Sequence, residues 1–472
     1  MNKSIREVYA KLRDNFSGDL LRPDDPRYAQ ARKIWNAMVV RTPSLIARCA
    51  DVADVQKAVR AAVVAEVLTA VRCGGHSLAG FSSCDGLVID LSHMRKVSVD
   101  AASRRARFAG GSLLGNVDRS TQAHGLAFPS GVVSHTGAGG LVLGGGTGWL
   151  ARRFGLSCDN VEGFEMVAAD GSLVRANASG NADLFWALRG GGGNFGIVTE
   201  FEVRLHSLSS VLLATSYVSG DDIYNILGNW REFMPEAPDE LKWNISLGLA
   251  PMKSEVPEEM RGQPAASISL AWFGIPEEGE RIIDRIFTRD NHFARTRKAM
   301  SFLELQTMAD GDFPQGRRYY TKSGYFSTLD DRTIKIMIEA QASIPSPNTQ
   351  IELAYLGGEV GRVGASETAF GDRSAAFIVN LLADWSDPND DAANVGWVRK
   401  LFGALRPTMK PGVYVNFMSG DEQERVPEAY VERWERIVAV KNHYDPGNFF
   451  RLNQNIQASK SNSTGKQTPH RT

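Results

Sequence analysis

The sequence predicts an α+β protein built in two parts. Its 472 residues exceed what one hydrophobic core usually holds, so two domains, or one domain with an insertion, are expected. Helix-like and strand-like segments alternate in the first half, and longer strands with amphipathic helices follow from about Ser207. Glycine gathers near residues 74–80, 131–148 and 190–196, which places the expected functional site in the first half.

Local signals define the elements of the first half. Asp51 is expected to cap a helix that gives way to a strand over residues 67–72. Asp170 and Gly171 lie between two alternating segments, which predicts a β-hairpin. Further strands are predicted at residues 87–92 and 104–111, and a helix at 112–126.

The second half combines strands and helices differently. Amphipathic segments alternate with strand-like ones, a pattern that indicates helices packed on an antiparallel sheet. The predicted strands are 241–250, 266–274, 350–358 and 375–385, and the predicted helices are 276–287 and 331–341. A closing helix is expected over residues 428–446, and the polar tail from 459 to 472 is expected to be disordered.

Composition argues against several classes of partner. Lys and Arg (53) almost cancel Asp and Glu (54), so no overall field attracts nucleic acid or an anionic membrane. Charges recur at short intervals in residues 1–16, which predicts neither a signal peptide nor a membrane anchor but a cytoplasmic protein. Cys49, Cys73, Cys84 and Cys158 form no CxxC pair, which argues against a disulfide framework or a metal site.

The third glycine cluster matches the dinucleotide fingerprint GxGxxG at Gly191, Gly193 and Gly196. That fingerprint works where a strand enters the turn and a helix leaves it. Here the helix-like residues 183–189 enter and the strand-like residues 197–203 leave. A Rossmann domain is therefore rejected, and the sequence contains neither a Walker motif nor HExxH.

The glycine-rich stretch from Gly137 to Trp149 has two interpretations, because so many glycines destabilise any regular element. It is either a set of tight turns with close chain packing or a backbone laid against a cofactor. In the second case its N–H groups form concavities that bind a pyrophosphate. Three glycine clusters in one half favour the second interpretation.

Several ordered motifs resemble one family of flavoproteins. The turn RCGGHS, residues 72–77, is similar to the R-x-G-G-H-S turn of covalent flavoproteins in the vanillyl-alcohol-oxidase superfamily. Five further stretches resemble the berberine-bridge-enzyme-like branch, and within it the bacterial 6-hydroxy-D-nicotine oxidase type. They are residues 130–161, 167–176, 183–205, 414–418 and 444–456. The resemblance is strong over residues 40–206 and 411–456 and weaker between them.

The resemblance implies a PCMH-type FAD-binding domain with an inserted substrate domain of antiparallel sheet covered by helices. Residues 1–206, completed by 418–458, would form the first domain and residues 207–417 the second. Substrate is expected between the inserted sheet and the isoalloxazine, since ligand sites favour domain interfaces.

The family also implies a covalent cofactor: FAD bound through its 8α carbon to His76, with the pyrophosphate on the backbone of residues 72–77. A neutral imidazole is a competent nucleophile for this bond, although His76 as an ordinary hydrogen-bonded side chain remains the alternative. Many members add a bond from a cysteine, but Val133 stands at that position, so one bond and not two is expected.

Further contacts with FAD are implied for the glycine loops, the strand after them and the C-terminal segment. The expected set is Arg72, Cys73, Gly74, Gly75, His76, Ser77, Gly131, Val132, His135, Thr136, Gly137, Ala138, Gly140, Leu143, Gly144, Gly145, Gly146, Gly148, Trp149, Gly196, Ile197, Val198, Asn453 and Asn455. Ala138 matches the position that controls access of O2, and its small side chain favours an oxidase; alternatively it only fits between glycines.

Tyr414 matches a tyrosine that faces the flavin in this branch and is the expected base or substrate anchor. Asn416, two residues on, is expected on the same side of a strand. A phenol titrates near pH 10, so Tyr414 needs a nearby cation or the flavin to activate it. An aromatic core residue is the alternative.

The segment RRYYTKSGYF, residues 317–326, concentrates cations and phenols in the second half. If it faces the cleft, Lys322 or Arg318 is expected to lower a tyrosine pKa, and Tyr319 or Tyr320 to line the substrate site. A solvated strand is the alternative.

The implied reaction is the two-electron oxidation of a small alcohol, phenol, sugar or amine, with O2 reduced to H2O2 and without a metal. The alternatives are a dehydrogenase that uses another electron acceptor and a flavin-binding protein without catalytic activity. A monomer and a homo-oligomer both stay open.

Overall fold

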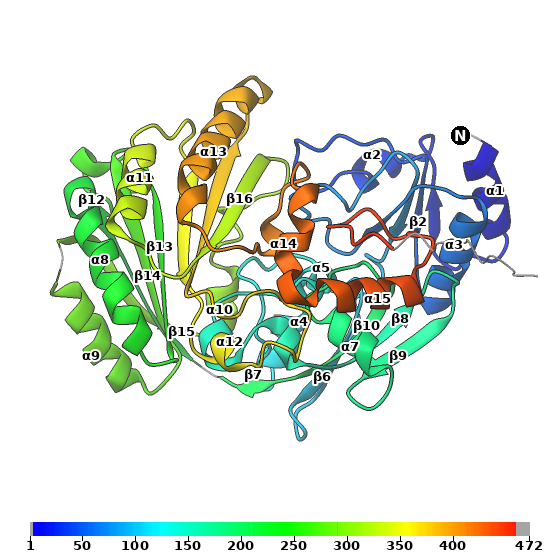
Figure 1. Ribbon diagram of the computed structural model, residues 1–472, viewed down its shortest axis with the longest axis horizontal. Helices are drawn as coiled ribbons and strands as arrows, with labels where there is room; N and C mark the ends of the chain where they lie inside the picture. Colours follow the sequence, from blue (N-terminus) through cyan, green and yellow to red (C-terminus); the bar gives the residue numbers. More distant parts are fainter. Residues whose placement is uncertain (1–2, 209, 290, 459–472) are drawn as a thin grey trace, which may run out of the picture.

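The computed structural model describes residues 3–208, 210–289 and 291–458. The predicted disordered tail lies outside these ranges. Two groups of elements lie side by side in Figure 1: the N-terminal half, which the C-terminal helices α14 (Val426–Tyr430) and α15 (Trp434–Tyr444) rejoin, and a large sheet with its helices. We propose that these groups are the two domains, with boundaries near residues 207 and 417. No helix of the described part has the length and hydropathy that a membrane span requires.

A four-stranded sheet opens the N-terminal half in the order β1 (Asp19–Leu21), β2 (Leu45–Arg48), β4 (Leu87–Asp90) and β3 (Thr69–Arg72). Strands β2, β4 and β3 run parallel, and helices α1 (Lys3–Leu12) and α3 (Val52–Val64) pack against them. Asp51 caps α3 as expected, because its carboxylate accepts a hydrogen bond from the Asp54 N–H at 2.9 Å. The turn RCGGHS begins where β3 ends, at the carboxyl edge of this sheet.

A five-stranded antiparallel sheet lies beside it. Its order is β5 (Val97–Asp100), β6 (Arg105–Ala109), β10 (Ile197–Arg204), β8 (Val161–Val167) and β9 (Leu173–Asn177). The predicted hairpin is confirmed, since β8 pairs with β9 around Gly171, whose φ is +77°. Helices α4 (Leu114–Gln122), α5 (Ala138–Leu143) and α7 (Ala182–Leu188) share the core of this sheet.

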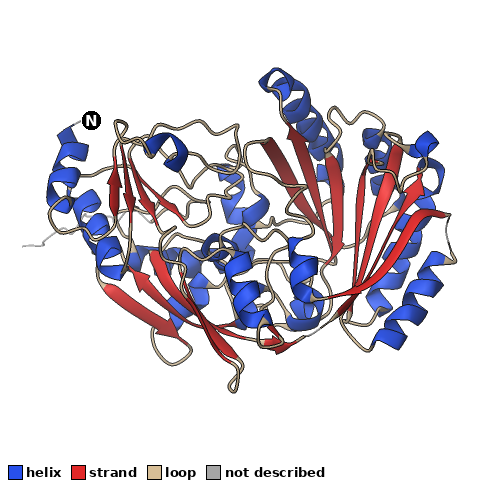
Figure 2. Ribbon diagram, turned by 180° about the vertical axis from the view of Figure 1, so that it is seen from behind, coloured by secondary structure: helices blue, strands red, loops and turns tan. Residues whose placement is uncertain are grey.

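The second half forms the predicted antiparallel sheet, with seven strands. Their order is β15 (His292–Met300), β12 (Val211–Ser219), β14 (Pro264–Trp272), β13 (Leu241–Leu249), β17 (Gln350–Tyr355), β18 (Phe377–Trp385) and β16 (Arg318–Phe326). Helices α8 (Ile223–Phe233), α9 (Pro276–Phe287), α11 (Asp331–Gln341) and α13 (Asp391–Leu405) cover one face (Figure 2). The opposite face of β16, β17 and β18 is turned toward the N-terminal half, and alternation along these strands decides which side chains reach it.

Short elements connect these layers: α2 (Tyr28–Ala31), β7 (Leu126–Ala127), α6 (Ala151–Phe154), β11 (His206–Ser207), α10 (Phe302–Thr307) and α12 (Glu359–Arg362). The single helix expected over residues 428–446 is corrected to two, α14 (Val426–Tyr430) and α15 (Trp434–Tyr444). Val431 between them has a φ of 43°, which no regular helix continues through.

A buried ion pair fixes the returning C-terminal segment to the third glycine cluster. The Lys441 ammonium donates to Asp445 at 2.6 Å, to the Asn194 carbonyl at 2.8 Å and to the Phe450 carbonyl at 3.0 Å. Both side chains of the pair are 0% exposed. A buried pair that loses one partner leaves an uncompensated charge, so this contact depends on both Lys441 and Asp445.

We therefore expect Lys441→Met to lower the free energy of unfolding by about 3–5 kcal/mol. Thermal unfolding of the purified FAD-loaded protein measures the effect. Lys298→Met is the matched control, because Lys298 pairs with Glu304 on the surface, and it should leave the melting temperature unchanged. Equal melting temperatures for the two variants would show that the Lys441–Asp445 pair does not stabilise the fold.

Candidate active site

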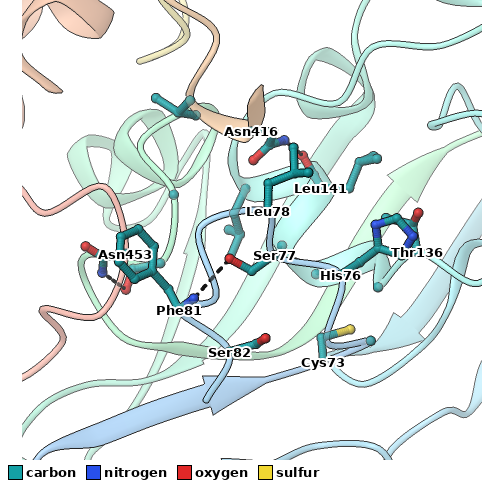
Figure 3. Close-up of a pocket in the computed structure, with 18 of the residues that line it drawn as sticks. Cys73, His76, Ser77, Leu78, Phe81, Ser82, Thr136, Leu141, Asn416 and Asn453 are labelled. Carbon is teal, nitrogen blue, oxygen red and sulfur yellow. Dashed lines mark hydrogen bonds between the residues drawn. The ribbon is translucent and has the colours of Figure 1, made fainter. Parts of the chain in front are cut away.

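A cavity of about 390 Å³ lies where the glycine clusters, the C-terminal segment and the seven-stranded sheet meet. Figure 3 shows Cys73, His76 and Ser77 on one loop of its wall, with Asn416 and Asn453 coming from distant segments. The sheet contributes Glu352, Asn380 and Leu382. The cavity therefore joins the two halves of the chain, as the sequence led us to expect of the substrate site.

The glycine loops pack closely against one another at some positions and leave open space for a ligand at others. A Cβ added at Gly74 would lie 2.4 Å from the Gly137 nitrogen, so the first two loops meet backbone to backbone. A Cβ added at Gly140 or Gly193 would meet no protein atom within 4 Å, and both residues line the cavity. Backbone left open in this way fits a large ligand held close to the chain.

No Lys or Arg side chain of the described ranges lines the cavity. The Arg72 guanidinium is 6% exposed and donates to Asp90 at 2.7 Å, outside the wall. A pyrophosphate here would therefore depend on backbone N–H groups of the glycine loops and not on cationic side chains.

His76 presents a neutral imidazole at the cavity wall. Burial, and next the neighbouring His135, lower the pKa of His76 to about 3. The ring stacks on Trp35 at a centroid distance of 4.0 Å and an interplanar angle of 17°. Its Nε2 atom is buried and has no hydrogen-bond partner in the described part of the chain. The ordinary alternative for His76, a hydrogen-bonded side chain, is therefore not supported at Nε2.

Most of the residues expected to contact FAD line the cavity. These are Cys73, Gly74, Gly75, His76, Ser77, Gly131, Val132, Thr136, Gly137, Gly140, Leu143, Gly196, Ile197, Val198 and Asn453. Val133, expected where other members carry a cysteine, also lies on the wall.

Nine expected residues are not on the wall: Arg72, His135, Ala138, Gly144, Gly145, Gly146, Gly148, Trp149 and Asn455. A Cβ at Gly144 would clash with Asn416 at 2.2 Å, and Trp149 packs in a separate apolar cluster, so these two positions serve packing. Ala138 is 0% exposed at the start of α5. Ala138 therefore does not reach the cavity as expected, and Thr136 and Gly137 lie on the wall beside it.

Tyr414 and Asn416 both line the cavity, but not from a strand. Val415–Phe417 is a 3₁₀ turn, which corrects the expected strand. The turn still brings the side chains together: Asn416 Nδ2 and the Gly146 N–H each donate to Tyr414 Oη at 3.0 Å. Because Tyr414 accepts both bonds, its own proton stays available for donation.

The pKa of Tyr414 is shifted in the direction opposite to the one that a base requires. Burial raises it to about 12, although hydrogen bonds from Asn416 and Gly146 act in the lowering direction. The expected cations do not reach it: Arg318 binds Asp391 at 2.6 Å, and Lys322 lies 3.3 Å from Glu422. Tyr414 is thus a hydrogen-bond donor at ordinary pH.

Lys322 and Tyr320 do not line the cavity, which corrects their expected place there. Alternation along β16 directs both side chains to the helix-covered face, where Tyr320 joins the core and Lys322 lies over the Phe402 ring of α13. Tyr320 also donates to Asp421 at 2.8 Å. Tyr319 faces the other way and stacks on Trp35, 3.7 Å between centroids.

Glu352, which was not expected at the site, is the one carboxylate on the described wall of the cavity. Ile351 and Leu353 belong to the helix-covered core, so Glu352 between them faces the N-terminal half. Its oxygens accept from Asn380 Nδ2 at 2.7 Å and Gln350 Nε2 at 3.0 Å, and Thr321 in turn donates to Asn380. Burial raises the pKa of Glu352. A glutamate within the apolar strand QIELAY was the available signal.

Known proteins share the sequence pattern and the fold of this chain. Residues 43–177 match a family described as FAD binding domain, and residues 413–457 match one described as berberine and berberine like. FAD-linked oxidoreductase YgaK of Bacillus subtilis is 32% identical over 453 residues, covering 93% of this chain and 97% of the relative. (R)-6-hydroxynicotine oxidase of Paenarthrobacter nicotinovorans is 30% identical over 468 residues, covering 95% and 98%.

A crystal structure of 6-hydroxy-D-nicotine oxidase from Arthrobacter nicotinovorans superposes with a TM-score of 0.85 at 28% identity, covering 94% of this chain and 99% of the other. With this fold and these relatives, the protein is an FAD-linked oxidoreductase. The chain belongs to the berberine-bridge-enzyme-like family of these enzymes.

Proposed function

We propose that the protein is an oxidase that removes two electrons from a small amine and carries FAD covalently on His76. The observation that carries the substrate class is the charge of the cavity wall: one carboxylate, Glu352, and no cation within the described residues. A carboxylate buried without an ion pair is costly, and a positively charged ligand offsets that cost. An acidic substrate would meet repulsion instead.

The remaining walls suit the apolar part of such an amine. Phe313, Phe417 and Leu382 line the cavity together with Val132. Two relatives named for oxidation of 6-hydroxynicotine support this choice over a sugar. The same relatives, named oxidases, are now the main support for O2 as the electron acceptor, since Ala138 does not reach the wall.

FAD, when bound, supplies the ring that accepts a hydride from the substrate carbon and passes both electrons to O2, which becomes H2O2. The protein's own groups manage the proton. Glu352 holds the ammonium of the amine and takes the proton that must leave its nitrogen. Asn380 and Gln350 fix the carboxylate. Tyr414 and Asn416 add polar groups to the cavity wall.

His76 fits the attachment point in three respects: it lines the cavity, it is neutral, and its Nε2 has no competing partner in the described ranges. Val133 offers no sulfur for a second bond, so attachment is single. The glycine cradle at Gly140 and Gly193 accommodates the rest of the cofactor.

Peroxide release from matched substrates tests the proposal. We expect (R)-6-hydroxynicotine or N-methylbenzylamine to yield H2O2 in amounts equal to the O2 consumed, and benzyl alcohol to yield far less. Turnover of the alcohol alone would refute the amine class. Turnover that needs a dye as electron acceptor would show a dehydrogenase, and no reduction by any substrate would favour a flavin-binding protein without catalytic activity.

A further inference from the structure

We propose that Trp35 is a positioning residue for the attachment of the flavin to His76. This inference rests on the proposed covalent bond. Trp35 lies ahead of the matched FAD-binding region, which begins at residue 43. It is 5% exposed, lines the cavity and belongs to no helix or strand.

Three rings form one stack across the junction of the two halves. The Trp35 indole lies between the His76 imidazole, at 4.0 Å and 17°, and the Tyr319 phenol, at 3.7 Å and 11°. Tyr319 is 1% exposed on β16, and its hydroxyl donates to the Pro314 carbonyl at 2.7 Å. The imidazole therefore packs on Trp35, and Trp35 in turn packs on Tyr319 of the seven-stranded sheet.

Hydrogen bonds hold Trp35 at its backbone and at its indole. The Trp35 N–H donates to the Gly75 carbonyl at 3.0 Å, next to His76 in the chain, and Nε1 donates to the Phe313 carbonyl at 2.9 Å. The Trp35 carbonyl accepts from the Gly316 N–H at 3.0 Å. The backbone bonds hold Trp35 in place, and the ring cannot turn about its side-chain torsions without breaking the bond from Nε1.

Asn36 also connects strand β16 to the loop that carries His76. Its Nδ2 donates to the Leu78 carbonyl at 3.1 Å and to the Tyr319 carbonyl at 2.8 Å. Its Oδ1 accepts from the Tyr319 N–H at 3.1 Å. Residues 35 and 36 thus join the His76 loop to strand β16.

The stack has a specific consequence for His76. Because Nε2 has no hydrogen-bond partner in the described chain, no bond to that nitrogen fixes the plane of the imidazole. The flat contact with Trp35 restricts that plane. Bond formation needs reacting atoms held in line at close range, and a misplacement of about 1 Å costs about 10²-fold in rate.

The attachment reaction balances without any atom from Trp35. One N–H bond of His76 and one C–H bond of the 8α-methyl group break, and one N–C bond forms. O2 takes the two electrons and two protons released and leaves as H2O2. Trp35 contributes only the orientation of the nitrogen.

The test measures attachment and not turnover. Four flavin-free proteins are saturated with FAD in air: wild type, Trp35→Leu, Trp35→Phe and Tyr319→Phe. Covalent flavin is then followed by intact mass and by flavin fluorescence on denaturing gels. We expect attachment to Trp35→Leu about 10- to 100-fold more slowly, with noncovalent FAD still bound. Trp35→Phe keeps a ring against His76 and should recover most of the rate; Tyr319→Phe, which loses only the bond to Pro314, should match wild type.

The outcomes separate this inference from the proposed function. If wild type never gains covalent flavin, the proposed attachment fails and the inference fails with it. If wild type is covalent and Trp35→Leu attaches flavin at the same rate, only the inference is wrong. Should Trp35→Leu not fold, Trp35→Met, which fills the space without a ring, is measured in its place, and a wild-type rate there overturns the inference.

Discussion

Replacing Glu352 with glutamine lowers kcat for an amine substrate by about 10²–10⁴-fold, the usual contribution of a positioned base. Glutamine keeps the size of Glu352 but accepts no proton and attracts no cation. Its carbonyl oxygen can still accept from Asn380, and its NH2 group can donate to Gln350 once the Gln350 amide turns its oxygen toward it. The FAD content stays that of wild type, because Glu352 belongs to the sheet and not to the glycine loops.

The pH dependence gives an independent signature of Glu352. Its pKa is raised above the ordinary value of a glutamate by burial, and only the deprotonated form takes a proton. The kcat of wild type should therefore rise with pH through that raised pKa, and Glu352→Gln should lack this rise. Glu359→Gln, an exposed glutamate on α12 paired with Arg362, is the control and should keep both kcat and the profile. A Glu352→Gln variant with wild-type kcat would exclude Glu352 as the base.

His76→Ala abolishes covalent attachment altogether. Wild type should carry the mass of one FAD through acid precipitation, and the visible flavin spectrum should remain with the pellet. The alanine variant should release all of its flavin into the supernatant, because burial raises the pKa of Cys73, the thiol on the same loop, to about 11 and keeps it protonated. Val133 offers no sulfur. His124→Ala, at an exposed position, controls for loss of a histidine.

Two results would contradict the attachment site. Flavin retained by His76→Ala would place the bond on another residue. Flavin released from wild type would leave the family membership intact and make the cofactor noncovalent. The stacked, neutral imidazole would then be a packing group, with its pKa lowered by burial and by His135.

Local signals made much of the fold predictable. Asp51 and the pair Asp170-Gly171 act through hydrogen bonds and backbone angles within a few residues, and both expectations are confirmed. The RCGGHS turn directly follows β3, so its place at a sheet edge could also be inferred. The glycine clusters pointed to the cofactor cradle because their chemistry depends on the backbone.

The substrate side of the cavity depends on contacts that sequence does not display. Glu352 reaches the cavity because β17 alternates and pairs Glu352 with Asn380 on β18. The same alternation turns Lys322 and Tyr320 away, against expectation. Trp35 meets Tyr319 across more than half of the chain, and no local pattern marks that contact.

Anaerobic titration of the purified enzyme with (R)-6-hydroxynicotine and N-methylbenzylamine tests the central claim most directly. We expect at least one of these amines to bleach the visible absorption of the bound flavin, and admission of O2 to restore it with release of H2O2. A flavin that both amines leave unchanged, while benzyl alcohol bleaches it, would contradict oxidation of an amine at Glu352.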